Sequence, residues 1–385
     1  MRRSLQLLAT LLLLASAQAA APFTVGVIVA KEGTARVTGD AESLAAIAYA
    51  SRLRAAGGIF GTPLEVRVED DAGDPAKALD AARALIGDGV DALLCCTTEA
   101  ASEQVAQLAE HAGVALLSPS TLQGVGATPY WSFSLAARDK DVLAAVVADA
   151  SARGLRSVGL MTLDNAFGDQ ANADLKALLA VAGLDEAGVA RYPPGTDDLT
   201  PEALWIATRQ PGAVVVWGLK PDLMVAVDGL RRRGFRGPVY ARSALLKPVM
   251  GGLDLTRLEG VRFAVPPVML VQHGLPADAR CGDAARTAAR RLQSVYGGVI
   301  DLGPAAPVYD ALDLLRAAFE QVAALRLPQG DLGARRQAVR DSLVGLPPTC
   351  GAGGLYNLQE GRRDALQPAG LAIAVVKDGQ LVAAP

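Results

Sequence analysis

The sequence predicts an α/β protein built from doubly wound parallel sheets, and three observations lead to this fold class. Strand-like runs at residues 64–68, 90–96 and 114–120 alternate with amphipathic helical runs at 75–86 and 100–113. This βαβαβ order is typical of a parallel sheet covered by helices. A similar alternation restarts after residue 139. The apolar content is mainly Ala, Leu and Val, as is typical of helices packed on buried parallel strands.

The composition indicates a chain large enough for two domains. It has 385 residues, of which 51% are apolar, so large cores can be buried. The net charge of -3 gives no electrostatic footprint for nucleic acid. Aromatic residues make up only 4%, which argues against stacking platforms for bases. We therefore expect no nucleic-acid partner.

Residues 1–21 are predicted to be a secretory signal peptide. Arg2 and Arg3 form a positive start, residues 5–14 are a short apolar run, and residues 17–19 match an A-x-A cleavage site. The alternative, a membrane anchor, needs about 20 apolar residues. No cysteine follows the cleavage site to carry a lipid. We therefore expect a soluble mature protein in the periplasm.

The first predicted unit begins with a strand at residues 23–30. A loop follows, and then a helix from about Asp40 to Ala56, with Asp40 as its N-cap. Two later strands end in hydroxyl-rich tips at residues 97–100 and 118–121. Ligands of parallel sheets bind at the carboxyl ends of the strands, so these two tips are candidate binding elements.

The second unit repeats the architecture of the first but not its sequence. Its predicted strands are residues 157–163, 188–192, 213–218 and 238–243, and its predicted helices are 167–183, 201–209 and 221–234. Two further helices are expected at about 278–296 and 307–325. The tail, residues 355–382, contains two strand-like runs that we expect to complete the second unit.

An ordered set of motifs resembles a known family. GG-I-x-G at residues 57–61, DDxxDPxxA at 70–78 and AEHAGVALLSPS at 109–120 follow one another as in the type I periplasmic binding proteins. The chain looks most similar to the leucine/isoleucine/valine-binding proteins of ABC importers. The resemblance is strong over about sixty residues as a set, although no single motif is specific.

The resemblance implies two lobes that close around a ligand through a three-crossing hinge. The N-terminal lobe would comprise residues 22–138 plus 267–350, and the C-terminal lobe 139–266 plus 351–385. The crossings would lie near residues 134–139, 263–268 and 350–354. It also implies a monomer that uses no cofactor and hands its ligand to membrane permease subunits.

The first lobe supplies six candidate ligand-binding residues, namely Thr98, Glu99, Ala100, Ser120, Thr121 and Thr38. The tip at Thr98 opens a helix, whose free N–H groups favour a carboxylate. Thr97 or Thr98 could equally be a plain N-cap, which is compatible with binding. Glu99 could pair with a ligand ammonium or simply point to solvent. Thr38 stands where the family has an aromatic residue against the ligand.

The second lobe supplies five candidates. Phe167 matches an aromatic residue that lies over the ligand in the family, and Trp217 ends a strand at the same edge. Leu219 replaces an aromatic residue. Arg242 and Ser243 stand where amino-acid binders often carry an acid for the ammonium. The base fits a carboxylate that lacks the amine, unless Arg242 only pairs with a surface acid.

Four cysteines in an exported chain suggest a disulfide. Cys281 and Cys350 fall in polar, loop-like sequence and are the predicted pair. The family often bridges the DDxxDP loop to the first tip, but Gly73 occupies the position of that partner. Cys95 and Cys96 are therefore predicted to be small buried side chains.

Catalysis, cofactors and metals are not expected. His111 lies in a helical run and His273 in a loop without a motif, and neither has a nucleophile or CxxC pattern nearby. The acidic run at residues 69–71 follows a strand and is predicted to shape a turn.

The sequence thus predicts an extracytoplasmic binding protein for a small carboxylate-bearing ligand. The ligand is either a branched-chain amino acid or an aromatic or aliphatic acid without an amine. Delivery to an ABC importer is the main hypothesis. The alternative is a ligand sensor of the same fold that feeds a membrane signalling receptor.

Overall fold

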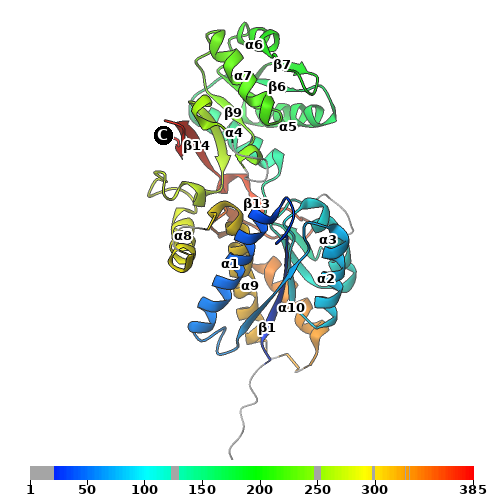
Figure 1. Cartoon of the computed structure of the whole chain (residues 1–385). Helices are drawn as coiled ribbons and strands as arrows, with labels where there is room; N and C mark the ends of the chain where they lie inside the picture. Colours follow the sequence, from blue (N-terminus) through cyan, green and yellow to red (C-terminus); the bar gives the residue numbers. More distant parts are fainter. Residues whose placement is uncertain (1–20, 123–129, 247–252, 297–299, 326, 329) are drawn as a thin grey trace, which may run out of the picture.

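The computed structural model describes residues 21–122, 130–246, 253–296, 300–325, 327–328 and 330–385. The predicted signal peptide therefore lies outside the described residues, apart from its last residue. Two parallel-sheet lobes lie one above the other in Figure 1 and are joined by a narrow waist. No helix among the described residues has the length and apolarity needed to cross a membrane.

The first lobe is built on a five-stranded parallel sheet of order β2-β1-β3-β4-β5. Its strands are β1 (Phe23–Val29), β2 (Leu64–Asp70), β3 (Ala92–Cys95), β4 (Ala115–Ser118) and β5 (Ser132–Ser134). Its helices are α1 (Arg36–Ala55), α2 (Pro75–Gly87), α3 (Glu99–Ala112), α8 (Gly282–Tyr296), α9 (Leu302–Ala324) and α10 (Leu332–Gly345).

Alternation along β1 explains how helices cover both faces of this sheet. Val27 and Val29 pack in a core with α1, α8, α9 and α10, whereas Ile28 packs in a second core with α2 and α3. Successive side chains of a strand point to opposite faces, so a strand buried on both sides is apolar throughout. All seven residues of β1 are buried.

The second lobe is built on a seven-stranded sheet of order β15-β14-β10-β9-β8-β6-β7. Its strands are β6 (Ser157–Leu163), β7 (Asp185–Tyr192), β8 (Ala213–Trp217), β9 (Val239–Ala241), β10 (Val261–Val265), β14 (Ala372–Lys377) and β15 (Gln380–Ala383). Its helices are α4 (Asp139–Ala152), α5 (Ala166–Ala182), α6 (Thr200–Ala207) and α7 (Lys220–Arg232). The tail strands β14 and β15 pair antiparallel and complete this sheet, as the sequence predicted.

Helix α1 begins earlier than the sequence predicted. The expected N-cap, Asp40, lies inside the helix and forms an ion pair of 3.1 Å with Arg36 one turn before it. Gly39 allows this close packing, because a Cβ there would lie 1.9 Å from the Ala30 carbonyl oxygen at the end of β1. Thr38 is therefore part of the first helical turn and not of a loop.

The chain crosses between the lobes at three places, and two of them agree with the prediction. The first follows β5 and ends at α4, and the second follows β10 near Pro267. The third differs, because residues 352–366 still pack in the core of the first lobe and only Ala372 joins the second sheet. This crossing therefore lies at residues 367–371 and not near 350–354.

Arg138 links the two sides of the first crossing. Its guanidinium donates to Asp141 on α4 at 3.0 and 3.1 Å. It also forms an ion pair with Asp364, whose backbone bridges Ser134 at the end of β5. The first and third crossings are thus tied together at the waist.

A small antiparallel sheet precedes the third crossing. It contains β11 (Thr349–Cys350), β12 (Leu355–Tyr356) and β13 (Leu366–Gln367). The structure joins Cys350 to Cys281 in a disulfide with a Cα–Cα distance of 4.9 Å. It also bonds Cys95 to Cys96, which are fully buried at the end of β3 and were predicted as separate apolar side chains.

The Asp310 carboxylate on α9 holds the loop next to this disulfide. It accepts hydrogen bonds of 2.7 Å from the backbone N–H groups of Ala352 and Gly353, and one of 2.9 Å from the Tyr356 hydroxyl. Burial raises the pKa of Asp310 to about 7, although the three donors act in the opposite direction. Its usual value is 3.8.

We expect Asp310→Asn to lower the free energy of unfolding by about 2 kcal/mol, because an amide NH₂ cannot accept all three bonds and leaves buried donors unpaired.

The raised pKa of Asp310 also makes stability depend on pH. Between about pH 4 and pH 7 the Asp310 carboxyl is protonated in the folded protein but ionised in the unfolded chain. Stability from this group is therefore complete below pH 4 and lost as the pH rises to 7. Urea unfolding at several pH values measures both effects. Asp283→Asn, at a fully exposed carboxylate on α8, should change neither.

Candidate functional site

The first binding element is the tip between β3 and α3. Thr98 is the N-cap of α3, and its hydroxyl accepts a hydrogen bond of 3.4 Å from the Ala101 N–H. The neighbouring Thr97 hydroxyl accepts from the Ala30 N–H at 3.0 Å and donates to a carboxylate oxygen of Glu42 at 2.5 Å. Thr98 thus caps the helix, and Thr97 fixes the position of the tip.

Glu42 is a tip residue that the sequence reasoning missed. It lies on α1, only 3% of its surface is exposed, and its carboxylate accepts the hydrogen bond from the Thr97 hydroxyl. Its signal in the sequence was weak, because it is a single acidic residue in a helical run made largely of small residues. The predicted position on α1, Thr38, lies one turn earlier and is half-buried.

The second tip, after β4, packs directly on the first. The Ser120 hydroxyl donates to the Thr97 carbonyl at 3.0 Å, and Ser120 is 7% exposed, so it supports the tip from behind. The Thr121 hydroxyl donates to a Glu99 carboxylate oxygen at 2.5 Å. Glu99 therefore does not only point to solvent: it joins the two tips, while Ala100 beside it is exposed.

The first-lobe tips consequently offer both donors and acceptors. The first N–H groups of α3 are donors that favour an anion. The carboxylates of Glu42 and Glu99 are acceptors that already receive threonine hydroxyls. An arrangement with two carboxylates suits an ammonium or hydroxyl group of a ligand at least as well as a carboxylate.

The second binding element surrounds Arg242, directly after β9. Its guanidinium lies over the Phe167 ring, with the carbon 4.7 Å from the ring centroid, and 5.6 Å from the Trp217 centroid. Its Nε and Nη2 atoms donate to Asp139, the closest contact being 2.9 Å. Its Nη1 group has no hydrogen-bond acceptor among the described residues. Arg242 therefore pairs with an acid, which was one of the two predicted alternatives. This ion pair uses Nε and Nη2, so Nη1 could still donate to a ligand oxygen.

Phe167 and Trp217 flank Arg242 in different ways. Phe167 follows the N-cap Asn165, whose side chain accepts from the Gly168 N–H at 3.1 Å, and it is half-buried. Trp217 is 1% exposed and packs in the core between the sheet and α4–α5. The Trp217 ring therefore lies in the core next to the guanidinium and not on the surface.

The last two candidates lie at the edge of this element. Leu219 is 45% exposed and precedes α7, where its N–H donates to Asp222 at 2.7 Å. Ser243 is half-buried and opens the short helix η1 (Ser243–Leu246) directly after Arg242.

The topology brings the two binding elements to the same side of their lobes. Both tips of the first lobe follow carboxyl ends of parallel strands, and β5 leaves the sheet from that same edge into the first crossing. Asp139 begins α4 at the end of that crossing and binds Arg242. The ion pair thus anchors Arg242 to the residue that follows the first crossing.

The described side chains do not form a metal site. No group of three or more His, Cys, Asp or Glu residues in the described ranges is arranged to hold a metal ion. The elements around Arg242 and the threonine tips are suited to hold a small polar molecule by hydrogen bonds and charge.

Comparisons with known proteins agree with this architecture. The family model for periplasmic binding proteins matches residues 22–380. The Leu/Ile/Val-binding protein homolog 3 of Brucella melitensis is 26% identical over 205 residues, which is 51% of this chain and 54% of that protein. The alignment thus spans about half the length of this curated relative.

Solved structures show the same fold. A putative branched-chain amino acid ABC transporter protein from Rhodospirillum rubrum has a TM-score of 0.75 at 22% identity, covering 94% of this chain and 100% of that one. The branched-chain amino acid substrate-binding protein LivJ of Streptococcus pneumoniae, in complex with isoleucine, has a TM-score of 0.65 at 16% identity, covering 94% and 97%.

The fold is that of a two-lobe protein of type I periplasmic-binding architecture. The chain belongs to the periplasmic binding protein family, as the match over residues 22–380 shows. Its family and relatives are substrate-binding proteins and not enzymes.

Proposed function

We propose that this protein is an extracytoplasmic solute-binding protein that captures a small carboxylate-bearing ligand between its lobes and delivers it to an ABC importer. Arg242 is the observation that supports this most directly. Its guanidinium is 17% exposed, is oriented by Asp139, and has no acceptor for Nη1 in the part of the chain that the structure describes. A guanidinium with a free N–H edge is a preferred partner for a carboxylate.

The remaining contacts divide between the lobes. The apolar part of the ligand lies on Phe167, which is half-buried beside Arg242. An ammonium or hydroxyl group of the ligand meets Glu99 and Thr121 at the first-lobe tips. This polarity is the reverse of the predicted one, in which the first lobe takes the carboxylate. Because each lobe holds only part of the ligand, ligand binding stabilises the closed form.

Export and membrane partners are part of the same proposal. Residues 1–21 would act as the signal peptide, and the mature chain would present its ligand to permease subunits in the membrane. The leucine/isoleucine/valine-binding relative and the transporter proteins of the same fold support this role.

Thermal-shift screening of residues 22–385 tests the proposal. One ligand set contains leucine, isoleucine, valine and other amino acids, and the other contains aromatic and aliphatic acids without an amine. Ligand at about 100 times its dissociation constant should add about 2.7 kcal/mol of stability, a shift of several degrees. Silence in both sets would refute the ligand class.

The two ligand sets also show whether Glu99 binds an ammonium group of the ligand. A response to amino acids alone requires a partner for the ammonium, and Glu99→Gln should then abolish that response. A response to amine-free acids alone leaves Glu99 without a role in binding, and Glu99→Gln should then have no effect.

A further inference from the structure

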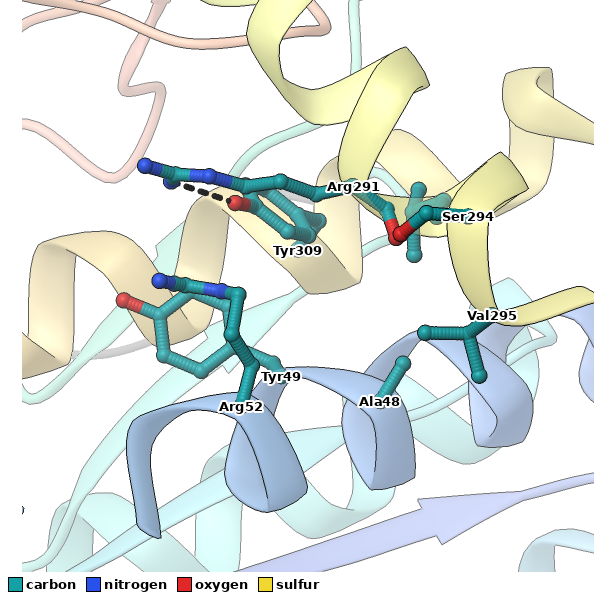
Figure 2. Close-up of a pocket in the computed structure, with 8 residues that line it drawn as sticks. Ala48, Tyr49, Arg52, Arg291, Ser294, Val295 and Tyr309 are labelled. Carbon is teal, nitrogen blue, oxygen red and sulfur yellow. Dashed lines mark hydrogen bonds between the residues drawn. The ribbon is translucent and has the colours of Figure 1, made fainter. Parts of the chain in front are cut away.

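A pocket lined by two arginines and two tyrosines, together with apolar side chains, lies on the first lobe. It is formed between α1, α8 and α9, and has a volume of about 70 Å³. Figure 2 shows Arg52 and Tyr49 on α1 facing Arg291 on α8 and Tyr309 on α9. A single water needs only about 10–15 Å³, so the pocket has room for a small polyatomic ion.

Two guanidinium groups enter this pocket without a carboxylate partner. Among the described residues, neither Arg52 nor Arg291 forms an ion pair. Arg52 Nε is buried and has no hydrogen-bond partner in the described part of the chain. The Arg52 guanidinium carbon lies 5.0 Å from the centroid of the Tyr49 ring. Within the described ranges, Arg291 donates to the Tyr309 hydroxyl alone, at 2.9 Å.

The nearest carboxylates are occupied by another cation. Asp313 accepts from the Tyr49 hydroxyl at 2.7 Å and from Arg316 at 3.3 Å, and Glu320 pairs with the same Arg316. The surroundings therefore carry three guanidinium groups against two carboxylates, an excess of one positive charge. Burial raises the pKa of Tyr49 far above its usual value, so its hydroxyl stays neutral and does not offset that charge.

The tyrosines make the pocket rigid and add a donor. The rings of Tyr49 and Tyr309 meet edge to face, with centroids 5.1 Å apart, and Tyr309 is 5% exposed. The Tyr309 oxygen accepts from Arg291, so its own proton can be donated into the pocket. Figure 2 shows the Arg52 and Arg291 side chains extending in the same direction, Arg291 next to the Tyr309 hydroxyl and Arg52 next to the Tyr49 ring.

We propose that this pocket is a binding site for a small oxyanion, with phosphate as the best-fitting class. Arg52 and Arg291 supply charged N–H donors from two helices, and the Tyr309 hydroxyl supplies a neutral one. A tetrahedral anion can accept from all three directions at once, which a planar carboxylate with two oxygens does less well. The inference is independent of the proposed function, because none of these residues takes part in the Arg242 site.

Titration calorimetry of residues 22–385 with sodium phosphate tests the site, with sodium chloride at the same ionic strength as the blank. Saturable binding of one phosphate is expected. Arg52→Gln and Arg291→Gln should each weaken it at least roughly tenfold, since a hydrogen bond to a charged group is lost. Arg290→Gln is the matched control, because this neighbouring arginine of α8 is exposed and donates only to Thr287. It should bind phosphate as the wild type does.

A second variant separates this site from the ligand site. Arg242→Gln should leave phosphate binding unchanged. Loss of phosphate binding in Arg242→Gln, equal heats from chloride and phosphate, or unchanged binding in both Arg52→Gln and Arg291→Gln would overturn the proposal. Circular dichroism of each variant shows that the first lobe is still folded, so a loss of binding is not mistaken for unfolding.

Discussion

Replacing Cys281 and Cys350 together by serine should lower the free energy of unfolding of the first lobe by about 4 kcal/mol. The disulfide closes a loop with a sequence separation of 69 residues. The chain-entropy relation for a loop of this length gives a stabilisation of about 4 kcal/mol, because the crosslink restricts the unfolded chain. The loop contains α8, α9 and α10, so its closure concerns three of the helices that cover the first sheet.

Denaturant unfolding with and without dithiothreitol measures this contribution. Without the reductant the double variant should unfold at clearly lower urea than the wild type. With the reductant the two proteins should unfold together, because the wild-type bridge is then open. A double variant as stable as the oxidised wild type would show that the bridge contributes nothing. The Cys281→Ser single variant controls for the free thiol, and it should match the double variant.

The fold class followed from the sequence because the pattern of the strands is set by burial on both faces. Buried parallel strands are continuous apolar runs, so β1, β3, β4 and β8 were all predicted close to their observed positions. The pairing of Cys281 with Cys350, which the structure contains, was a prediction from the polar character of both segments.

Helix α10 was not predicted, and the reason lies in its buried face. Its buried residues include Arg336 and Arg340, which a hydrophobic pattern assigns to solvent. The Arg336 guanidinium donates to the carbonyls of Val90 and Ile86 at 2.9 and 3.0 Å, and Arg340 donates to the Tyr130 carbonyl at 3.0 Å. Both side chains pack their stems and satisfy their charges with partners far away in the sequence.

The start of α1 and the third crossing were misplaced for a related reason. Local signals placed Asp40 as an N-cap, but the contact between Gly39 and the end of β1 decides where the helix begins. The hydrogen bonds from the N–H groups of residues 352–353 to Asp310 keep this segment packed on the first lobe, so the chain crosses later than the sequence indicated. In each case a tertiary contact overrides the local preference.

The candidate site was predictable where it follows strand ends and unpredictable where it depends on partners. Thr98 and Thr121 were proposed because they follow β3 and β4 at one edge of the sheet. Glu42 was missed, since only the folded lobe shows that α1 brings a carboxylate to Thr97. The burial of Trp217 could not be predicted either. Every residue of β8 is buried, so the sequence does not show on which face of the sheet the Trp217 ring packs.

Arg242→Gln should weaken binding of the ligand found in the screen by about 2 kcal/mol, or roughly 30-fold. Glutamine keeps a neutral donor but removes the charge that meets the ligand carboxylate. The cost to folding should be small, because the partner Asp139 is 42% exposed and can be hydrated. Calorimetry of the variant and the wild type under the same conditions measures the change.

Two further variants decide whether Arg242 acts on the ligand or only on Asp139. Asp139→Asn removes the anion that competes for the guanidinium but keeps an acceptor, so it should bind the ligand at least as well as the wild type. Arg257→Gln removes another arginine–aspartate pair of the second lobe, with Asp228, and should leave affinity unchanged. If Arg242→Gln and Arg257→Gln bind equally well, the guanidinium of Arg242 is only a structural partner of the waist. A selective loss in Arg242→Gln, with Asp139→Asn unimpaired, would instead mean that the ligand binds the Arg242 guanidinium itself and does not need the charge of Asp139. That outcome would also explain why a base can stand after β9, where amino-acid binders often have an acid: the acceptors for an ammonium are supplied by the first lobe.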